Sequence, residues 1–141
     1  MILVDTNVAY ALIDAAEPDH GRCVRWFART GRTSLLVSPL VIAETCYLLD
    51  RNLGPSAEAT FLSSIGAGRT FTYQLVELLP VDVVRVEALV RQYADRRLGG
   101  TDASLAAIGE RLNVTTIATM NRRDFDNLRP AHIRAFTIVP D

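Results

Sequence analysis

The chain contains no lysine, and all fifteen of its basic residues are arginine. This absence excludes lysine-based phosphate loops, Schiff-base sites and any other chemistry that needs a lysine. A GC-rich genome is the ordinary explanation for such a bias. Arginine nevertheless binds phosphate oxygens through two parallel hydrogen bonds, so a polyanionic partner remains open.

Cysteine is scarce, and no apolar stretch reaches the length that spans a membrane. Cys23 and Cys46 are too few and too far apart to form a zinc site, and their apolar surroundings predict buried free thiols. Free thiols suit a reducing cytoplasm. Asp5 interrupts the N-terminal apolar run and no basic segment precedes it, which argues against a signal peptide. We therefore expect a cytoplasmic protein without a membrane partner.

Length and composition predict one compact domain over residues 1–141. The hydrophobic fraction is 49% and the formal net charge is −1, so we expect a buried core and no strong overall attraction to nucleic acid or membranes. Any contact with nucleic acid must then depend on local charge.

Short apolar runs alternate with helical patterns along the chain. This alternation predicts an α/β fold in which helices cover both faces of a mainly parallel sheet. In such a fold, ligands bind beyond the carboxyl ends of the strands. The expected strands are residues 2–4, 35–37, 76–79, 115–118 and 136–139, and the expected helices are residues 8–14, 18–30, 40–51, 56–65, 80–93 and 102–112.

Capping residues and apolar spacing support these helices. We expect Thr6 or Asn7 to cap the first helix and Thr101 to cap the last. The helix at 80–93 is expected to be amphipathic, because apolar residues recur in it at helical spacing. These residues are Val83, Val86, Val90 and Tyr93.

Four acids stand at positions that such a fold would bring together. Asp5 ends an apolar strand, Glu44 is the only charge between Val41 and Leu49 in an apolar helix, Asp102 opens a helix, and Asp124 follows the strand at 115–118. Burying a charge is costly unless a partner cancels it. A cluster of carboxylates therefore predicts a hard cation between its members, with Mg²⁺ first and Mn²⁺ as its substitute.

Each acid also has an ordinary explanation. Asp5 could cap a helix, and Glu44 could pair with a buried arginine. Asp102 is favoured by the helix dipole alone, and Asp124 lies in a polar loop where acids are common. The metal-site prediction depends on the joint placement of all four.

Four segments of the chain together resemble a PIN domain, and more narrowly the VapC toxins of bacterial toxin–antitoxin pairs. The segments are Asp5-Thr6-Asn7, Glu44 in its apolar helix, residues 99–107 (GGTDASLAA) and residues 117–125 (IATMNRRDF). The resemblance implies a magnesium-dependent endoribonuclease with a three-layer α/β/α fold. It also implies a homodimer that a VapB antitoxin neutralises.

The resemblance implies roles for individual residues. Asp5, Glu44 and Asp102 correspond to the catalytic acids, with Asp5 and Asp102 as principal metal ligands. Thr6 and Thr119 correspond to small hydroxyl residues beside the metal.

One position departs from the family pattern. Asn121 stands where an aspartate is common, and an amide oxygen brings no negative charge to a metal. Asp124 could supply the missing carboxylate as a fourth catalytic acid and metal ligand. We therefore predict that Asp124→Ala impairs cleavage more than Asn121→Ala.

Two further groups are candidates for contact with partners. The pairs Arg96-Arg97 and Arg122-Arg123 flank the acids and could bind RNA phosphates, or could simply be solvated surface. An aromatic pair on an early helix could contact the antitoxin, or could pack in the core. This pair is Trp26 and Phe27.

The function we expect is a toxin that cuts a structured RNA, in a transfer RNA or ribosomal RNA loop, by attack of metal-activated water. A PIN domain that binds RNA or protein without cutting is the alternative that Asn121 supports. A phospho-signalling receiver domain also gathers acids around magnesium, but it needs a lysine that this chain lacks.

Overall fold

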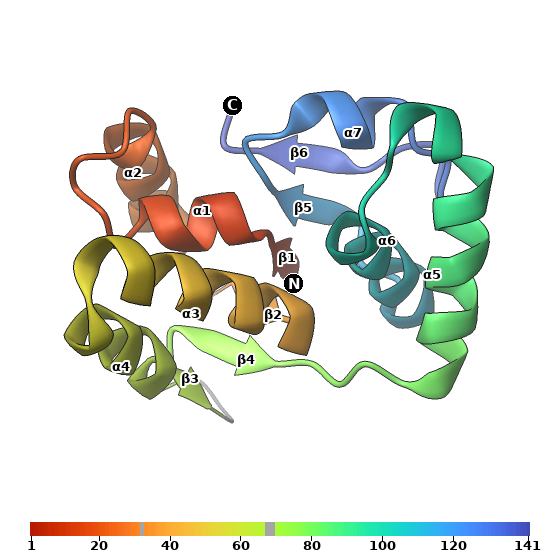
Figure 1. Cartoon of the computed structure of the whole chain (residues 1–141). Helices are drawn as coiled ribbons and strands as arrows, with labels where there is room; N and C mark the ends of the chain where they lie inside the picture. The colour runs from red at the N-terminus through yellow and green to blue at the C-terminus, as the bar shows by residue number, and fades with distance from the viewer. Residues whose placement is uncertain (32, 67–69) are drawn as a thin grey trace.

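The computed structural model describes residues 1–31, 33–66 and 70–141. Within these ranges the strands are β1 (Ile2–Val4), β2 (Leu35–Val37), β3 (Ile65–Gly66), β4 (Tyr73–Leu75), β5 (Thr116–Ala118) and β6 (Thr137–Val139). The helices are α1 (Thr6–Ala11), α2 (His20–Thr30), α3 (Pro39–Leu53), α4 (Pro55–Ser63), α5 (Pro80–Gln92), the short 3-10 helix η1 (Ala94–Arg96), α6 (Gly100–Leu112) and α7 (Arg122–Asp126). In Figure 1 the helices gather in two groups, with α1 to α4 on the left and α5 with α6 on the right.

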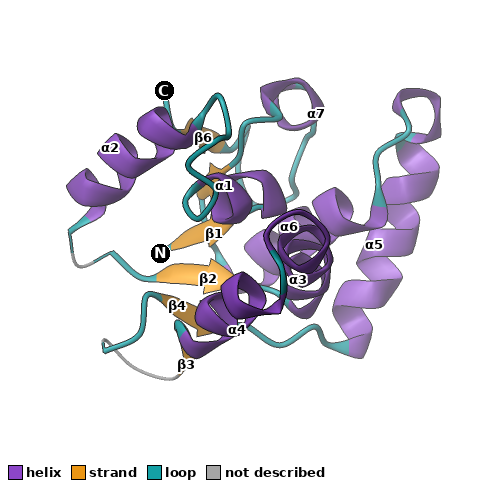
Figure 2. Cartoon of the chain, turned by 60° about the vertical axis from the view of Figure 1, so that its left-hand side comes forward, coloured by secondary structure: helices purple, strands orange, loops and turns teal. Residues whose placement is uncertain are grey.

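The described strands form one parallel sheet in the order β3-β4-β2-β1-β5-β6. Figure 2 shows them one above another, from β6 at the top to β3 at the bottom, with α2 on one side and α3, α5 and α6 on the other. Leu3 pairs with Leu36 on β2 and with Ile117 on β5, and all three side chains are buried. Continuous apolar runs are typical of strands covered on both faces. The expected α/β fold with a parallel central sheet is confirmed.

The order in which successive strands are added to the sheet reverses beside β1. From β1 the chain moves to β2 on one side, and it later returns to β5 on the other side. Such a switch point leaves a crevice at the carboxyl ends of the two central strands. Asp5 follows β1 and Thr119 follows β5, so both residues lie at this crevice.

Helix α6 packs tightly against the sheet because its central residues are small. Every residue from Ala103 to Gly109 is buried. A Cβ atom at Gly109 would lie 3.0 Å from the ring of Phe136, so a side chain there would require this ring to shift. This packing holds the first turn of α6, and with it Asp102, at the crevice.

Two arginine–carboxylate pairs connect α5 to α6. The Arg85 guanidinium binds both carboxylate oxygens of Glu110, at 2.7 and 2.8 Å, and Arg111 binds Asp82 at 2.8 Å. Burial alone would raise the pKa of Asp82, but the hydrogen bonds from Arg111 and from the Leu79 amide, with the charge of Arg111, lower it below its usual range. Both carboxylates are therefore well compensated.

These pairs also orient α5 differently from the expectation. Asp82 and Leu89 are the buried residues of α5, whereas Val83 and Val90 are 51% and 36% exposed. The ion pairs and Leu89 face α6, which turns Val83 and Val90 outward. The other two residues of the predicted apolar face, Val86 and Tyr93, are half-buried and pack against the core.

The strand expected at residues 76–79 is displaced. The observed strand is β4, which pairs Tyr73 with Leu35 and Leu75 with Val37. Val76 continues the pairing by one hydrogen bond, from its amide to the Val37 carbonyl at 2.9 Å, and Pro80 then begins α5. The apolar residues that suggested a strand are the connection into this helix.

Several element boundaries also differ. The first helix begins at Thr6 with Asp5 as its N-cap, so neither Thr6 nor Asn7 caps it. Gly99, and not Thr101, is the N-cap of α6. Strand β3 follows α4 where the helix was expected to continue, and the segment of Asp124 forms α7 where a loop was expected.

The remaining expectations concern thiols and membranes. Cys23 is buried and Cys46 half-buried, and both are free thiols, as expected. Throughout the described ranges, the helices are too short or too polar to cross a bilayer.

Candidate active site

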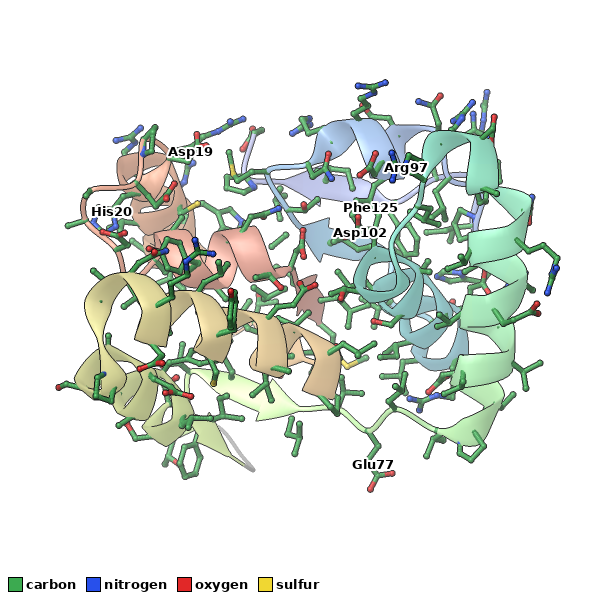
Figure 3. All side chains as sticks on the ribbon, viewed as in Figure 1. Asp19, His20, Glu77, Arg97, Asp102 and Phe125 are labelled. Atoms are coloured by element: carbon green, nitrogen blue, oxygen red, sulfur yellow. The ribbon has the colours of Figure 1, made fainter. Side chains whose placement is uncertain are left out.

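Three of the four predicted acids line one cleft at the switch point. Asp5 comes from the end of β1, Glu44 from α3 and Asp102 from the first turn of α6. The cleft has a volume of about 300 Å³. Figure 3 labels Asp102 at the start of α6, between the two groups of helices. Segments far apart in the sequence thus bring carboxylates to a common space.

Asp5 is held rigidly by neutral donors. Its carboxylate accepts hydrogen bonds from the Thr6 amide at 2.7 Å, the Asn7 side chain at 2.8 Å and the Thr119 hydroxyl at 2.7 Å. The side chain is almost fully buried. Burial, with a contribution from the charge of Glu44, raises the pKa of Asp5 although these hydrogen bonds oppose the change.

Asn7 is a positioning residue that the sequence reasoning treated only as a possible cap. Its amide nitrogen donates to Asp5 and, at 3.2 Å, to the Thr119 hydroxyl. Its amide oxygen accepts from the Met120 amide at 2.9 Å. Asn7 therefore joins the ends of β1 and β5. Its place beside Asp5 in the Asp5-Thr6-Asn7 segment was the available signal.

Glu44 lies on the exposed side of α3 and is not buried in an apolar helix. Its two carboxylate oxygens accept from the hydroxyls of Thr6 at 2.8 Å and Thr101 at 2.9 Å. The alternative of a buried arginine partner was therefore wrong. Thr101, expected as a helix cap, instead helps to fix Glu44 at the cleft.

Burial and neighbouring acids oppose the charge of Asp102. Burial, together with the nearby charges of Asp5, Asp124 and Glu44, raises its pKa to about 7. At neutral pH a large fraction of this carboxyl keeps its proton unless a cation offsets the charge. The arrangement is electrostatically unfavourable without a positively charged ligand.

Asp124 and Asn121 line two different cavities. Asn121 lines the acid cleft, whereas Asp124 lines an adjoining cavity. The Asn121 amide nitrogen donates to the Asp124 carboxylate, and the charge of Asp124 contributes to the raised pKa of Asp102. Asn121 thus connects the fourth acid to the other three.

The chemistry of the donors fits a hard divalent cation. The cleft offers carboxylate, amide and hydroxyl oxygens, which Mg²⁺ and Mn²⁺ prefer. The raised pKa values of Asp5 and Asp102 indicate negative charge that lacks a counter-charge. Yet in the part of the chain that the structure describes, no three acidic, histidine or cysteine side chains are already grouped closely enough to enclose a metal ion.

The four candidate RNA-binding arginines differ in their surroundings. Arg96, Arg97 and Arg123 line the cavity that adjoins the acid cleft. Arg122 instead donates to the carbonyl oxygen of Pro140 at 3.2 Å, near the C-terminus.

The two aromatic residues on α2 differ in their exposure to solvent. Trp26 is 6% exposed and belongs to the core, so its side chain is not part of a free surface. Phe27 is 37% exposed and lines an apolar cavity with Leu12 and Val24.

A family model described as the PIN domain matches residues 2–129, which include all four acids. The chain belongs to the PIN domain family. It is 33% identical to Ribonuclease VapC26 of Mycobacterium tuberculosis over 139 residues, which cover 99% of this chain and 100% of the relative. The resemblance to VapC proteins is thus confirmed.

Two crystal structures share the PIN fold of this chain. One is VapC20 of Mycobacterium tuberculosis, described as a toxin that cleaves the sarcin–ricin loop, with a TM-score of 0.78, 20% identity and coverage of 95% of this chain and 99% of that one. The other is FitAcB from Neisseria gonorrhoeae, with a TM-score of 0.65, 21% identity and coverage of 97% of each chain. At these identities the likeness concerns the fold.

Proposed function

We propose that this PIN domain is the toxin of a toxin–antitoxin pair and acts as a metal-dependent endoribonuclease. One observation carries the proposal: Asp5, Glu44 and Asp102 converge on one cleft at the carboxyl edge of the sheet. Similarity to a protein named a ribonuclease supports RNA as the substrate.

Asp5 and Asp102 would hold the cation, and Glu44 would complete the carboxylate set. When bound, Mg²⁺ or Mn²⁺ neutralises the scissile phosphate and lowers the pKa of the attacking water. Thr119 and Asn7 orient Asp5 by hydrogen bonds. No protein nucleophile is required for this reaction.

The substrate we propose is a loop of a structured RNA, either a transfer RNA or ribosomal RNA. The net charge of −1 gives little general attraction to RNA, so recognition by shape and by local arginines is favoured. The sarcin–ricin loop activity in the description of VapC20 makes that ribosomal loop a suitable first substrate to test.

A VapB-type antitoxin is the protein partner we propose, and Phe27 supports a place for it. The apolar cavity beside Phe27 has a volume of about 230 Å³. An amphipathic segment of the antitoxin would bury its apolar side chains there. Phe27→Ser should release cleavage from inhibition by the antitoxin and leave cleavage by the free toxin unchanged.

A homodimer is the assembly we propose, and the outward face of α5 supports it. Val81, Val83 and Val84 are 62%, 51% and 70% exposed. Clustered exposed apolar side chains are typical of interaction surfaces, and a two-fold axis would place identical faces together. Val84→Glu should therefore yield a monomer in light scattering.

The decisive experiment incubates the antitoxin-free protein with total RNA and with an isolated sarcin–ricin hairpin. Reactions contain Mg²⁺, Mn²⁺ or a chelator, and they compare the wild type with Asp5→Asn. We expect discrete fragments that require both the metal and Asp5. The matched control is Asp50→Asn, because Asp50 is an exposed acid on α3 outside the cleft.

Equal cleavage by Asp5→Asn would contradict the proposal, and so would cleavage in the chelator. RNA binding without cleavage under either metal would favour the non-catalytic PIN domain. In the same assay, Asp124→Ala should lose more activity than Asn121→Ala, because only Asp124 brings negative charge. The reverse order would make Asn121 the more important of the two.

A further inference from the structure

A second cavity, beside the acid cleft, has arginines as three of its six lining residues. Its volume is about 430 Å³, and it lies between the connection from α5 to α6 and helix α7. Figure 3 labels Arg97 on this connection. The cavity is lined by Asp95, Arg96, Arg97, Arg123, Asp124 and Asn127.

The three guanidinium groups of this cavity are exposed and uncommitted. Over the described ranges, the side chains of Arg96, Arg97 and Arg123 form no hydrogen bond or ion pair with the protein, although two carboxylates share their cavity. By contrast, Arg85 and Arg111 are bound to carboxylates. Each free guanidinium keeps five N–H donors, which fit the oxygens of a phosphate.

The backbone brings these arginines to the cavity at some conformational cost. Arg97 has φ 58°, a left-handed conformation that is uncommon for residues other than glycine and asparagine. This conformation ends η1 and turns the chain toward Gly99, which lines the acid cleft. The turn therefore presents an arginine next to the predicted metal site.

One layer of side chains separates the two cavities. Asp124 lies in the wall of the arginine cavity, and Asn121 lies in the wall of the acid cleft. The amide of Asn121 donates to the Asp124 carboxylate, so the two walls are joined directly. A negatively charged chain that enters the acid cleft would pass the arginines within a short distance.

We propose that the arginine cavity binds a phosphate of the RNA backbone next to the phosphodiester that occupies the acid cleft. The inference rests on the proposed function, because it takes RNA as the substrate. It adds a binding subsite formed by Arg96, Arg97 and Arg123, and it excludes Arg122, whose guanidinium is bound to the Pro140 carbonyl. Phosphate contacts position a nucleic acid without reading its bases, so this subsite sets the register of cleavage and not the sequence.

The subsite should bind phosphate without a metal, because its positive charge comes from arginines. This property separates its test from the test of cleavage. Binding is measured by fluorescence anisotropy of a labelled sarcin–ricin hairpin in a chelator, at several salt concentrations. The variant is Arg96→Gln with Arg97→Gln and Arg123→Gln, and circular dichroism checks its fold.

The matched control removes three arginines elsewhere, by Arg25→Gln, Arg29→Gln and Arg134→Gln. These arginines are also exposed and form no ion pair within the described ranges. Both triple variants change the net charge equally, so a difference between them reports position. Arg97→Gln alone serves if the triple variant does not fold.

We expect the cavity variant to bind RNA at least ~10-fold more weakly, with a salt dependence reduced by about one for each phosphate that the variant no longer binds. The control variant should bind within ~2-fold of the wild type. Equal affinity of the two variants would overturn the inference, even if the wild type cleaves RNA. Failure of the wild type to cleave would overturn the proposed activity and leave the binding result standing.

Two other ligands offer related chemistry. If the cavity variant loses affinity only for a 5′-phosphorylated hairpin, and not for a 5′-hydroxyl hairpin, the ligand of the cavity is a terminal phosphate. An acidic antitoxin segment would show itself if the cavity variant keeps its RNA affinity and loses antitoxin binding. Either result would overturn the backbone assignment.

Discussion

Two sets of buried or half-buried acids in this molecule have opposite surroundings. Asp82 and Glu110, between α5 and α6, are each bound by an arginine. Asp5 and Asp102, at the cleft, have neutral donors and other acids as neighbours. The fold thus compensates the charges of Asp82 and Glu110 with arginines, whereas burial and neighbouring acids oppose the charges of Asp5 and Asp102.

The pKa shifts express the same contrast. Burial opposes ionisation at Asp82 and Glu110 as well, but arginine hydrogen bonds and charges outweigh it and lower both pKa values. At Asp102 no arginine intervenes, and burial with neighbouring acids raises the pKa to about 7. Perturbation upward within a cleft is typical of functional carboxylates.

The largest expected effect comes from neutralising a cleft acid. Asp102→Asn should lower the rate of RNA cleavage by at least ~1,000-fold, because it removes a proposed metal ligand, and yet it should not destabilise the metal-free protein. Cleavage assays and urea unfolding in a chelator measure the two effects. A loss of stability on this substitution would place Asp102 with the structural acids.

Removing the arginine partner of a structural acid should lower stability and leave cleavage unchanged. Arg111→Met leaves Asp82 buried without a counter-charge, which should cost about 3 kcal/mol of unfolding free energy. The cleavage rate of the folded variant should stay within ~2-fold of the wild type. Urea unfolding measures the loss of unfolding free energy. An unchanged midpoint would show that the buried Asp82 does not need Arg111 as its counter-charge.

The two sets should also respond to pH with opposite signs. Asp102 has its pKa raised from 3.8 to about 7, so the folded state binds the proton more tightly and this group destabilises the metal-free protein as pH rises through that interval. Asp82, with a lowered pKa, contributes stability at higher pH that is lost as pH falls below its ordinary value of 3.8.

The comparison between wild type and Asp102→Asn isolates the pH-dependent destabilisation that Asp102 causes. In a chelator, the variant should gain on the order of 1 kcal/mol over the wild type between pH 5 and pH 8, after allowance for screening by water. Added Mg²⁺ should reduce the difference. A parallel pH dependence of the two proteins would contradict the assignment of the charge to Asp102.

The smallest effect should come from an exposed pair of the same residue types. Glu87 and Arg91 form an ion pair one turn apart on α5, with side chains that are 58% and 81% exposed. Glu87→Gln should change the unfolding free energy by less than ~0.5 kcal/mol, because water screens such pairs. A change of several kcal/mol would show that exposure does not separate structural pairs from surface pairs here.

Local patterns predicted the parts of the fold that depend on neighbouring residues. The apolar run before Asp5 and the helix break at Gly99-Gly100 were sufficient to place β1 and α6. The rule that ligands bind at strand ends then grouped Asp5 with the segment from Thr119 to Asp124. The mainly parallel α/β sheet was predictable for the same reason.

Long-range pairing determined what the sequence could not predict. Residues 76–79 looked like a strand, but the register with β2 places the strand at Tyr73–Leu75. The direction of the α5 valines depends on Arg111 and Glu110, which belong to another helix. The Asn7 hydrogen bond to Met120 joins positions 113 residues apart, and no local spacing encodes it.

The link from Asn7 to the end of β5 has a consequence for synthesis of the chain. Asp5 emerges early from the ribosome, but its contacts with Thr119, and the pairing of β1 with β5, require most of the polypeptide. A nascent or truncated chain that stops before β5 therefore has its first acid and no assembled catalytic cleft. The proposed nuclease would therefore stay incomplete until translation is nearly finished.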